Sequence, residues 1–177
     1  MKRLSGILFA VSVLLALATV AAACGGDGSD RRAREYFEEI VQIAGQYGAD
    51  VEAAQATYDA VVAADTGEEE EVRAFLFLLE TSSKSIRGEI ADREKVDPPP
   101  KIEEAHLELL AAARLAAKVY EDGFESASGA KTALELRQAL GAVDYGVRLE
   151  EAQGRAEQAC TRLQALADEE GVEAQVC

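Results

Sequence analysis

Apolar side chains recur every three or four positions along most of this chain, and no segment shows the two-residue alternation of a β-strand. The first stripe runs from about residue 31 to residue 64. Its members are Phe37, Ile40, Val41, Ala44, Tyr47, Val51, Ala54, Tyr58, Val61 and Val62. Three-and-four spacing held over many turns predicts a long amphipathic helix.

Three further stripes predict helices over about residues 68–96, 101–124 and 130–170. Thr66 with Glu69 three residues later has the pattern of a capping box, which we expect to start the second helix. The inward side of that helix comprises Val72, Phe75, Leu76, Leu79, Ser83, Ile86 and Ile90. The inward side of the last helix begins with Leu136, Leu140, Val143 and Val147, and after Gly146 the stripe shifts to Leu149, Ala152, Ala156, Ala159, Leu163 and Leu166.

Prolines and glycines mark the breaks between these helices. The run DPPP at residues 97–100 ends the second helix, because proline disfavours helical geometry in the residue before it. Gly171 is expected to stop the last helix in a left-handed conformation. Gly141, Gly146 and Gly154 lie inside the predicted last helix, where glycine costs stability relative to alanine. We interpret these three as marks of close packing or a bend.

Four long helices with short connections predict an all-α fold, an up-down-up-down four-helix bundle. Two helical hairpins packed less regularly are the alternative. The apolar positions are rich in alanine and the chain has no tryptophan. We therefore expect closely packed helices around a thin core.

The N-terminal segment has a different pattern. Lys2 and Arg3 precede 20 apolar or small residues, which end at Ala23 and are followed by Cys24. A basic start, an apolar middle and small residues before a cut site describe a secretory signal peptide. The length of the run also suits a membrane-spanning helix.

The end of that run, VAAAC at residues 20–24, resembles the lipobox of bacterial lipoproteins. The resemblance covers residues 1–24 and departs from the family at Ala21, where leucine is preferred. It implies cleavage before Cys24 and attachment of acyl chains to that cysteine. The predicted organisation is a signal peptide over 1–23, a lipidated cysteine and flexible linker over 24–30, and a helical domain over 31–177. An uncleaved anchor helix or an ordinary signal peptide are the alternatives.

Charge narrows the classes of partner. The chain carries 33 acidic and 18 basic residues, and losing Lys2 and Arg3 with the signal peptide leaves a net charge of about −17. Such a surface repels nucleic acid, whose binding requires Lys and Arg at phosphates. It also repels anionic lipid headgroups, so a lipid anchor would hold the domain at the bilayer against its own charge.

Two cysteines remain after Cys24. Outside the cytoplasm, free thiols tend to oxidise, so we predict a disulfide between Cys160 and Cys177. Closing a loop of about 17 residues is worth roughly 3 kcal/mol in the chain-entropy model. The predicted bond would staple a short tail that folds back after Gly171.

Glu103 and His106 form the most suggestive motif, EEAH. Glu-x-x-His on two facing helices holds a di-iron centre in ferritin-like bundles. The chain has one histidine, so the second motif cannot form. A mononuclear metal site on His106, Glu103 and a carboxylate from another helix is one hypothesis. A core histidine bonded to a neighbouring carboxylate or carbonyl is the other, and it is our prediction.

No residue set is assigned to catalysis. We interpret Ser82 and Ser83, in mid-helix beside Lys84, as sites of close helix packing rather than as part of a Ser–Lys nucleophile. The sequence thus predicts a non-enzymatic lipoprotein without a cofactor, anchored at the outer face of the cell membrane. Its expected partners are the lipid bilayer and an envelope protein. The alternative is a helical bundle that binds a small ligand or metal in a groove near His106.

Overall fold

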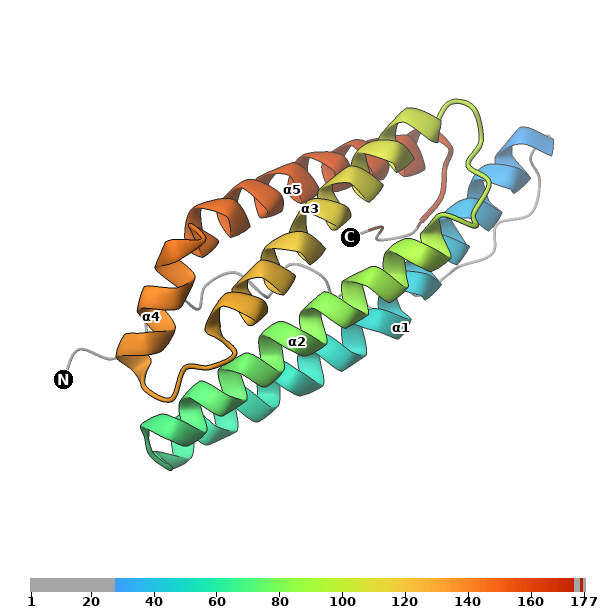
Figure 1. Ribbon diagram of the computed structural model, residues 1–177. Coiled ribbons are helices and arrows are strands. Elements are labelled where there is room, and N and C mark those ends of the chain that lie inside the picture. The colour runs from blue at the N-terminus through green and yellow to red at the C-terminus, as the bar shows by residue number, and fades with distance from the viewer. Residues whose placement is uncertain (1–27, 174–175, 177) are drawn as a thin grey trace.

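The computed structural model describes residues 28–173 and residue 176. Its five helices, in chain order, are α1 Gly28–Ala64, α2 Glu68–Arg93, α3 Glu103–Ala127, α4 Ala133–Ala142 and α5 Tyr145–Glu169. They pack as an all-α bundle, which confirms the all-α class, with five helices in place of the predicted four (Figure 1). The predicted signal peptide, Cys24 and Cys177 lie outside the described residues.

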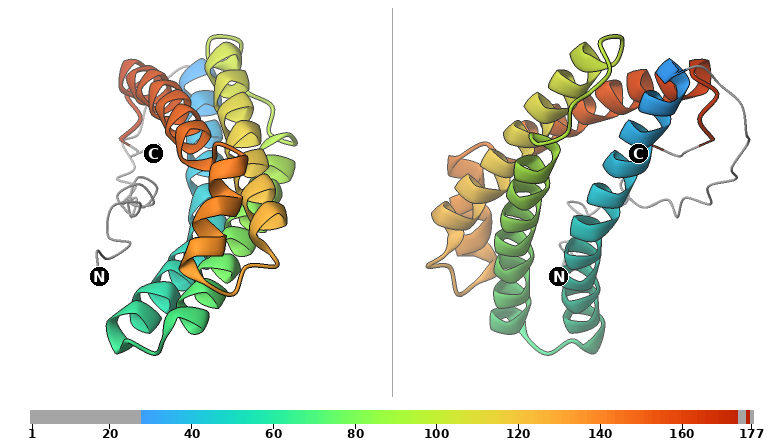
Figure 2. Two further views of the ribbon diagram at one scale, coloured as in Figure 1. Left: turned by 60° about the vertical axis from the view of Figure 1, so that its left-hand side comes forward. Right: turned by 90° about the vertical axis from the view of Figure 1, so that its right-hand side faces the viewer.

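The helices lie in the order α1, α2, α3, α5 across the bundle. α1 and α2 form a hairpin, α2 packs on α3, and α3 packs on α5. α1 and α5 come together at one end of the bundle and separate toward the other (Figure 2). The core is divided accordingly. One apolar cluster joins the first half of α1 to the end of α5, and a second joins α2 and α3 to α4.

The predicted last helix is in fact two helices, α4 and α5. Asp144 separates them in the left-handed conformation, with φ of 49°. Not all residues expected on the inward face are buried after this break. Val147 is 70% exposed, whereas Tyr145 is buried. The prediction of Val147 as a core residue was wrong because the break shifts the phase of the helix.

The predicted capping box at the start of α2 is absent. Gly67 occupies the N-cap position with φ of 110°, and no side chain caps this helix. Thr66 precedes the N-cap position by one residue, because α2 begins at Glu68 and Gly67 is its N-cap. The described residues do contain a capping box at α4. There the Thr132 hydroxyl accepts a hydrogen bond from the backbone N–H of Glu135, and the Glu135 carboxylate accepts one from the N–H of Thr132.

The proline run is a short linker, as predicted, although α2 ends at Arg93 rather than near residue 96. The Pro99 carbonyl accepts hydrogen bonds from the N–H groups of Ile102 and Glu103, at 2.8 and 3.1 Å. This turn leads directly into α3. Ile102 is 1% exposed and attaches the linker to the first apolar cluster.

The chain after α5 folds back on the bundle. Gly171 adopts the predicted left-handed conformation, with φ of 66°. Val172 and Val176 are buried against the first apolar cluster. The N–H of Val176 donates to the Gln164 side-chain carbonyl at 3.0 Å. The predicted Cys160–Cys177 bond stays a prediction because Cys177 lies outside the described residues.

Among the helices that the structure describes, none combines the length and apolar character needed to cross a membrane.

Candidate functional site

Four polar residues meet inside the bundle where α1, α2 and α3 converge. We call Tyr36, Glu89, Arg93 and His106 the buried polar cluster. Tyr36 comes from α1, Glu89 and Arg93 from the end of α2, and His106 from the first turn of α3. Tyr36 and His106 are each 3% exposed and Arg93 is 2% exposed. Polar groups are rarely buried so completely unless they are paired.

Tyr36 and His106 are paired with each other. The Tyr36 hydroxyl lies 3.0 Å from His106 Nδ1, and the rings meet edge to face with centroids 5.7 Å apart. Burial raises the pKa of Tyr36 well above its usual range. Burial, assisted by the positive charge of Arg93, lowers the pKa of His106. Both side chains are therefore neutral at pH 7.

Arg93 carries the positive charge of this cluster. Its Nε and Nη2 atoms lie 2.8 and 2.6 Å from Glu89 Oε1, one turn earlier on α2. Its Nη1 atom is buried and has no hydrogen-bond partner. A buried guanidinium is stable only when an opposite charge accompanies it, so Glu89 is required for Arg93 to lie inside.

Sequence reasoning missed Arg93, although a signal was present. Arg93 continues the inward spacing of Ile86 and Ile90 by three residues, so helical phase alone would place it inside. Arginine at such a position is normally assigned to the surface by its charge. Its partner Glu89, at i−4, is the sequence feature that permits burial.

The structure does not bring together the residues of the alternative hypothesis, a metal site on His106 and Glu103. His106 is buried with Nδ1 in contact with Tyr36, whereas Glu103 is exposed to solvent. Among residues 31–173 and 176, no group of three His, Cys, Asp or Glu side chains is placed to hold a metal ion. The expected carboxylate or carbonyl partner of His106 is a tyrosine hydroxyl instead.

A second set of polar contacts joins α1 to α2. The Tyr47 hydroxyl donates to Asp92 Oδ2 at 2.6 Å, and the Ser85 hydroxyl donates to the Tyr47 carbonyl at 2.7 Å. Lys95 and then Tyr47 lower the pKa of Asp92 through their hydrogen bonds. The ring of Tyr47 lies against Gly88, where a Cβ would come within 3.0 Å of Tyr47 Cζ. A side chain at residue 88 would therefore have to displace the ring of Tyr47.

The mid-helix serines serve packing, as predicted. Ser82 and Ser83 are buried, and the Ser83 hydroxyl points to the Ala117 carbonyl of α3 at 3.5 Å. Lys84 is 74% exposed and paired with Glu80. A Ser–Lys nucleophile requires a lysine withdrawn from solvent, and the side chain of Lys84 is exposed instead.

The three glycines expected at close contacts are not close to anything. A Cβ at Gly141, Gly146 or Gly154 would meet no atom within 4 Å, apart from its own helix backbone. The close contacts occur at Gly88, against Tyr47, and at Gly123, against Tyr145. The α4–α5 break falls between Gly141 and Gly146, which agrees with the bend interpretation for that segment.

The side chains of the buried polar cluster bond to one another and have little contact with solvent. The buried polar cluster holds one ion pair and one neutral hydrogen-bonded pair, and three of its four side chains are almost fully excluded from water. General acid–base catalysis requires a reactant within hydrogen-bond reach of the catalytic group. The cluster instead selects one packing of α1, α2 and α3, because other packings leave these groups unpaired.

Comparisons with protein-family models, with curated proteins and with solved structures find no match to this chain.

Proposed function

We propose that this chain is a bacterial-type lipoprotein whose helical bundle is a non-enzymatic binding or accessory module at the outer face of the cell membrane. The observation that carries the proposal is VAAAC at residues 20–24, placed at the end of a basic-then-apolar leader. Acyl chains on Cys24 would hold the bundle at the bilayer, and an envelope protein would be its partner.

The rest of the chain is consistent with this role. Its excess of acidic side chains disfavours direct contact with anionic lipid, so attachment would depend on the anchor. Its buried polar cluster is enclosed by helices and offers a rigid scaffold rather than an accessible reaction centre. A rigid helical surface suits recognition of another protein with little loss of conformational entropy.

A disulfide between Cys160 and Cys177 is part of the same proposal. The Gln164 side chain accepts a hydrogen bond from the N–H of Val176. Gln164 lies one helical turn after Cys160, on the same face of α5. The buried Val176 thus holds the described end of the chain close to the turn that carries Cys160. An oxidising compartment outside the cytoplasm would favour the bond.

Metabolic labelling with a clickable fatty acid tests the anchor. The wild-type protein should incorporate the label, and Cys24→Ser should abolish incorporation while the protein is still made. Label retained in Cys24→Ser would show that Cys24 is not the acylated residue and would remove the basis of the proposal.

Crosslinking at the surface of intact cells tests the partner. The wild-type chain should capture the same envelope protein reproducibly, and Cys24→Ser should lose it because the bundle is no longer held at the membrane. Equal capture by both chains, or no capture by either, would contradict an anchored accessory module.

A further inference from the structure

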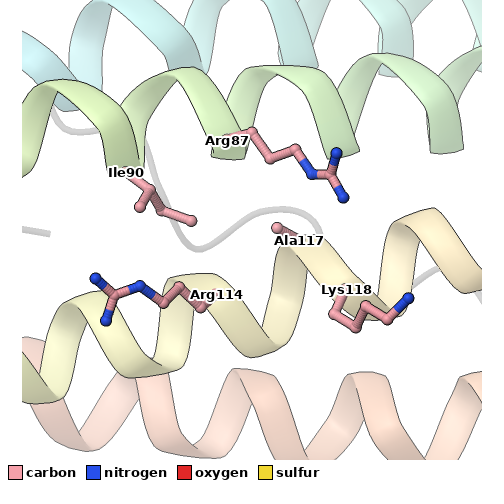
Figure 3. A pocket seen from close by; sticks show the side chains of 5 residues that line it. All are labelled: Arg87, Ile90, Arg114, Ala117 and Lys118. Carbon is pink, nitrogen blue, oxygen red and sulfur yellow. The ribbon is translucent and has the colours of Figure 1, made fainter.

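A pocket of about 270 Å³ lies between α2 and α3. It is lined by Arg87 and Ile90 from α2 and by Arg114, Ala117 and Lys118 from α3 (Figure 3). Ile90 and Ala117 are buried and lie between the two helices. The head groups of Arg87 and Lys118 extend toward one end of the pocket and that of Arg114 toward the other.

The side chains that line the pocket carry a charge opposite to that of the molecule, and each of the three cations is paired with a carboxylate beside the pocket. Three of its five lining side chains are cations and none is acidic, in a chain with 33 acidic and 18 basic residues. Cations gathered around an apolar surface provide two kinds of contact at once. The charged groups attract an anion, and the apolar surface can take the carbon skeleton attached to it.

A carboxylate already binds two of these cations. Glu121 of α3 forms ion pairs with both Arg87 and Lys118, and Asp122 of α3 forms a second, shorter pair with Lys118, 2.7 Å from Nζ. Arg114 is paired with Glu94 of α2, with Nη2 2.5 Å from Oε1. The side chains of the three cations are 54–57% exposed, so their ion pairs are in contact with water. Exposed ion pairs of this kind are weak, and another oxyanion can replace any of these carboxylates.

We propose that this pocket binds a small organic oxyanion, a carboxylate or phosphate on a compact apolar body. Arginine guanidinium groups match the planar geometry of such anions and bind them through two parallel hydrogen bonds. The volume of the pocket is slightly below the usual range for ligand sites, which limits the ligand to a small one. Glu121 would compete with the ligand for Arg87 and Lys118. This proposal does not depend on the lipid anchor.

Calorimetric titration of the full chain in non-ionic detergent with phenyl phosphate tests the site. The wild-type protein should bind one equivalent, with benzyl alcohol as the neutral control showing none. Arg87→Gln should weaken binding about tenfold, the effect of losing one charge-assisted contact, and Arg114→Gln should weaken it less, because the Arg114 head group lies at the other end of the pocket. Glu121→Gln should tighten it, because the competing carboxylate is removed.

Lys84→Gln is the matched control. Lys84 is on α2, one turn before Arg87, and is paired with Glu80, but it does not line the pocket. Lys84→Gln removes one positive charge, as Arg87→Gln does. Because Lys84 lies outside the pocket, the dissociation constant of this variant for phenyl phosphate should stay within twofold of wild type. No saturable binding, or equal losses in Lys84→Gln and Arg87→Gln, would overturn the proposal. If Arg87→Gln does not fold, Arg87→Lys keeps the charge and should still weaken binding by losing the bidentate geometry.

The anionic head could belong to a soluble molecule or to a lipid. Dihexanoyl phosphatidylglycerol and glycerol 3-phosphate, each used below any micelle-forming concentration, distinguish the two sources. Tighter binding of the lipid would assign a phospholipid headgroup, and tighter binding of glycerol 3-phosphate would assign a soluble phosphate ester. Failure of both, together with phenyl phosphate, would contradict the site itself.

Discussion

At the scale of single residues, Arg93 is the least expected feature of the molecule. A fully buried guanidinium with one unpaired Nη1 atom is costly, and Glu89 is the ion-pair partner that the described contacts give it. Beside it, Tyr36 and His106 satisfy each other without charge. The inside of this bundle therefore depends on a few specific polar contacts as well as on apolar area.

Removing Glu89 should destabilise the fold more than removing Arg93. Glu89→Ala leaves a buried positive charge unpaired, which typically costs about 3–5 kcal/mol of unfolding free energy. Arg93→Met keeps most of the volume and removes the charge, so its cost should be clearly smaller. Urea unfolding of both variants measures the difference. A Glu89→Ala loss equal to or below that of Arg93→Met would contradict the role given to this ion pair.

His106 should make stability fall in mild acid. Burial and the charge of Arg93 lower its pKa in the folded state below the ordinary 6.5, so the unfolded chain binds the proton more readily. The stability contribution is full above about pH 6.5 and is lost as the pH falls to the folded-state pKa.

His106→Asn is the variant that isolates this effect, since asparagine can still bond to Tyr36 and does not titrate. Unfolding free energies measured from pH 7 to pH 5 should fall more steeply for wild type than for His106→Asn. Other titrating groups act on both chains alike. Parallel curves would show that His106 is not held neutral by the fold.

At the scale of helices, glycines and caps determine where elements pack and begin. Gly88 lets α1 approach α2 through Tyr47, whereas Gly154 on α5 has open space around it. Both glycines lie inside helices, and the local sequence does not show which of them is in close contact with another helix. Only the neighbouring helix distinguishes a required glycine from a replaceable one.

Gly88→Ala and Gly154→Ala should have opposite effects. At Gly88 the added methyl meets the Tyr47 ring, and such overpacking costs about 1–3 kcal/mol. At Gly154 nothing opposes the methyl, so the better helix propensity of alanine should stabilise the protein by up to about 1 kcal/mol. Thermal unfolding compares the two. Stabilisation by Gly88→Ala would refute the close contact.

Thr132 caps the N-terminus of α4, whereas Thr66 does not cap α2. Thr132→Ala should cost about 1 kcal/mol, because it removes the side-chain acceptor of the α4 capping box. Thr66→Ala should change little, because Gly67 is the N-cap of α2. Urea unfolding of the pair measures this, and an equal effect at both positions would contradict these assignments.

At the scale of the whole molecule, α3 is the central element. It packs on α2 along one side and on α5 along the other, while α1 meets α5 only at one end. The folded-back tail adds Val172 and Val176 to the cluster at that end. The end of the chain therefore contributes to the same core as the start of α1.

Reduction should lower the melting temperature if Cys160 and Cys177 are joined. Loss of roughly 3 kcal/mol corresponds to about 10 °C for a domain of this size. The double variant Cys160→Ala, Cys177→Ala should melt at the reduced temperature and ignore the reductant. Two thiols that can be alkylated before reduction, seen by intact mass, would refute the bond.

The helical class, most helix boundaries and most of the inward faces of α1 and α2 follow from the three-and-four spacing, because burial of one face is a local property of the pattern; Val62, at the end of the α1 stripe, is exposed. The same spacing could not reveal the break at Asp144. The apolar residues on either side of it, such as Leu140 and Leu149, fit either one continuous helix or two helices whose inward faces are rotated relative to each other. Contact with neighbouring helices decides between these.

By itself the sequence determined the all-α class, the linker at the prolines and the left-handed stop at Gly171. Each depends on the conformational preferences of neighbouring residues along the chain. Only the tertiary structure decided that Arg93 and His106 are buried, that Gly88 rather than Gly154 is required, and that Arg87, Arg114 and Lys118 line one pocket. These features depend on groups from different helices, and the distance between helices is set by packing.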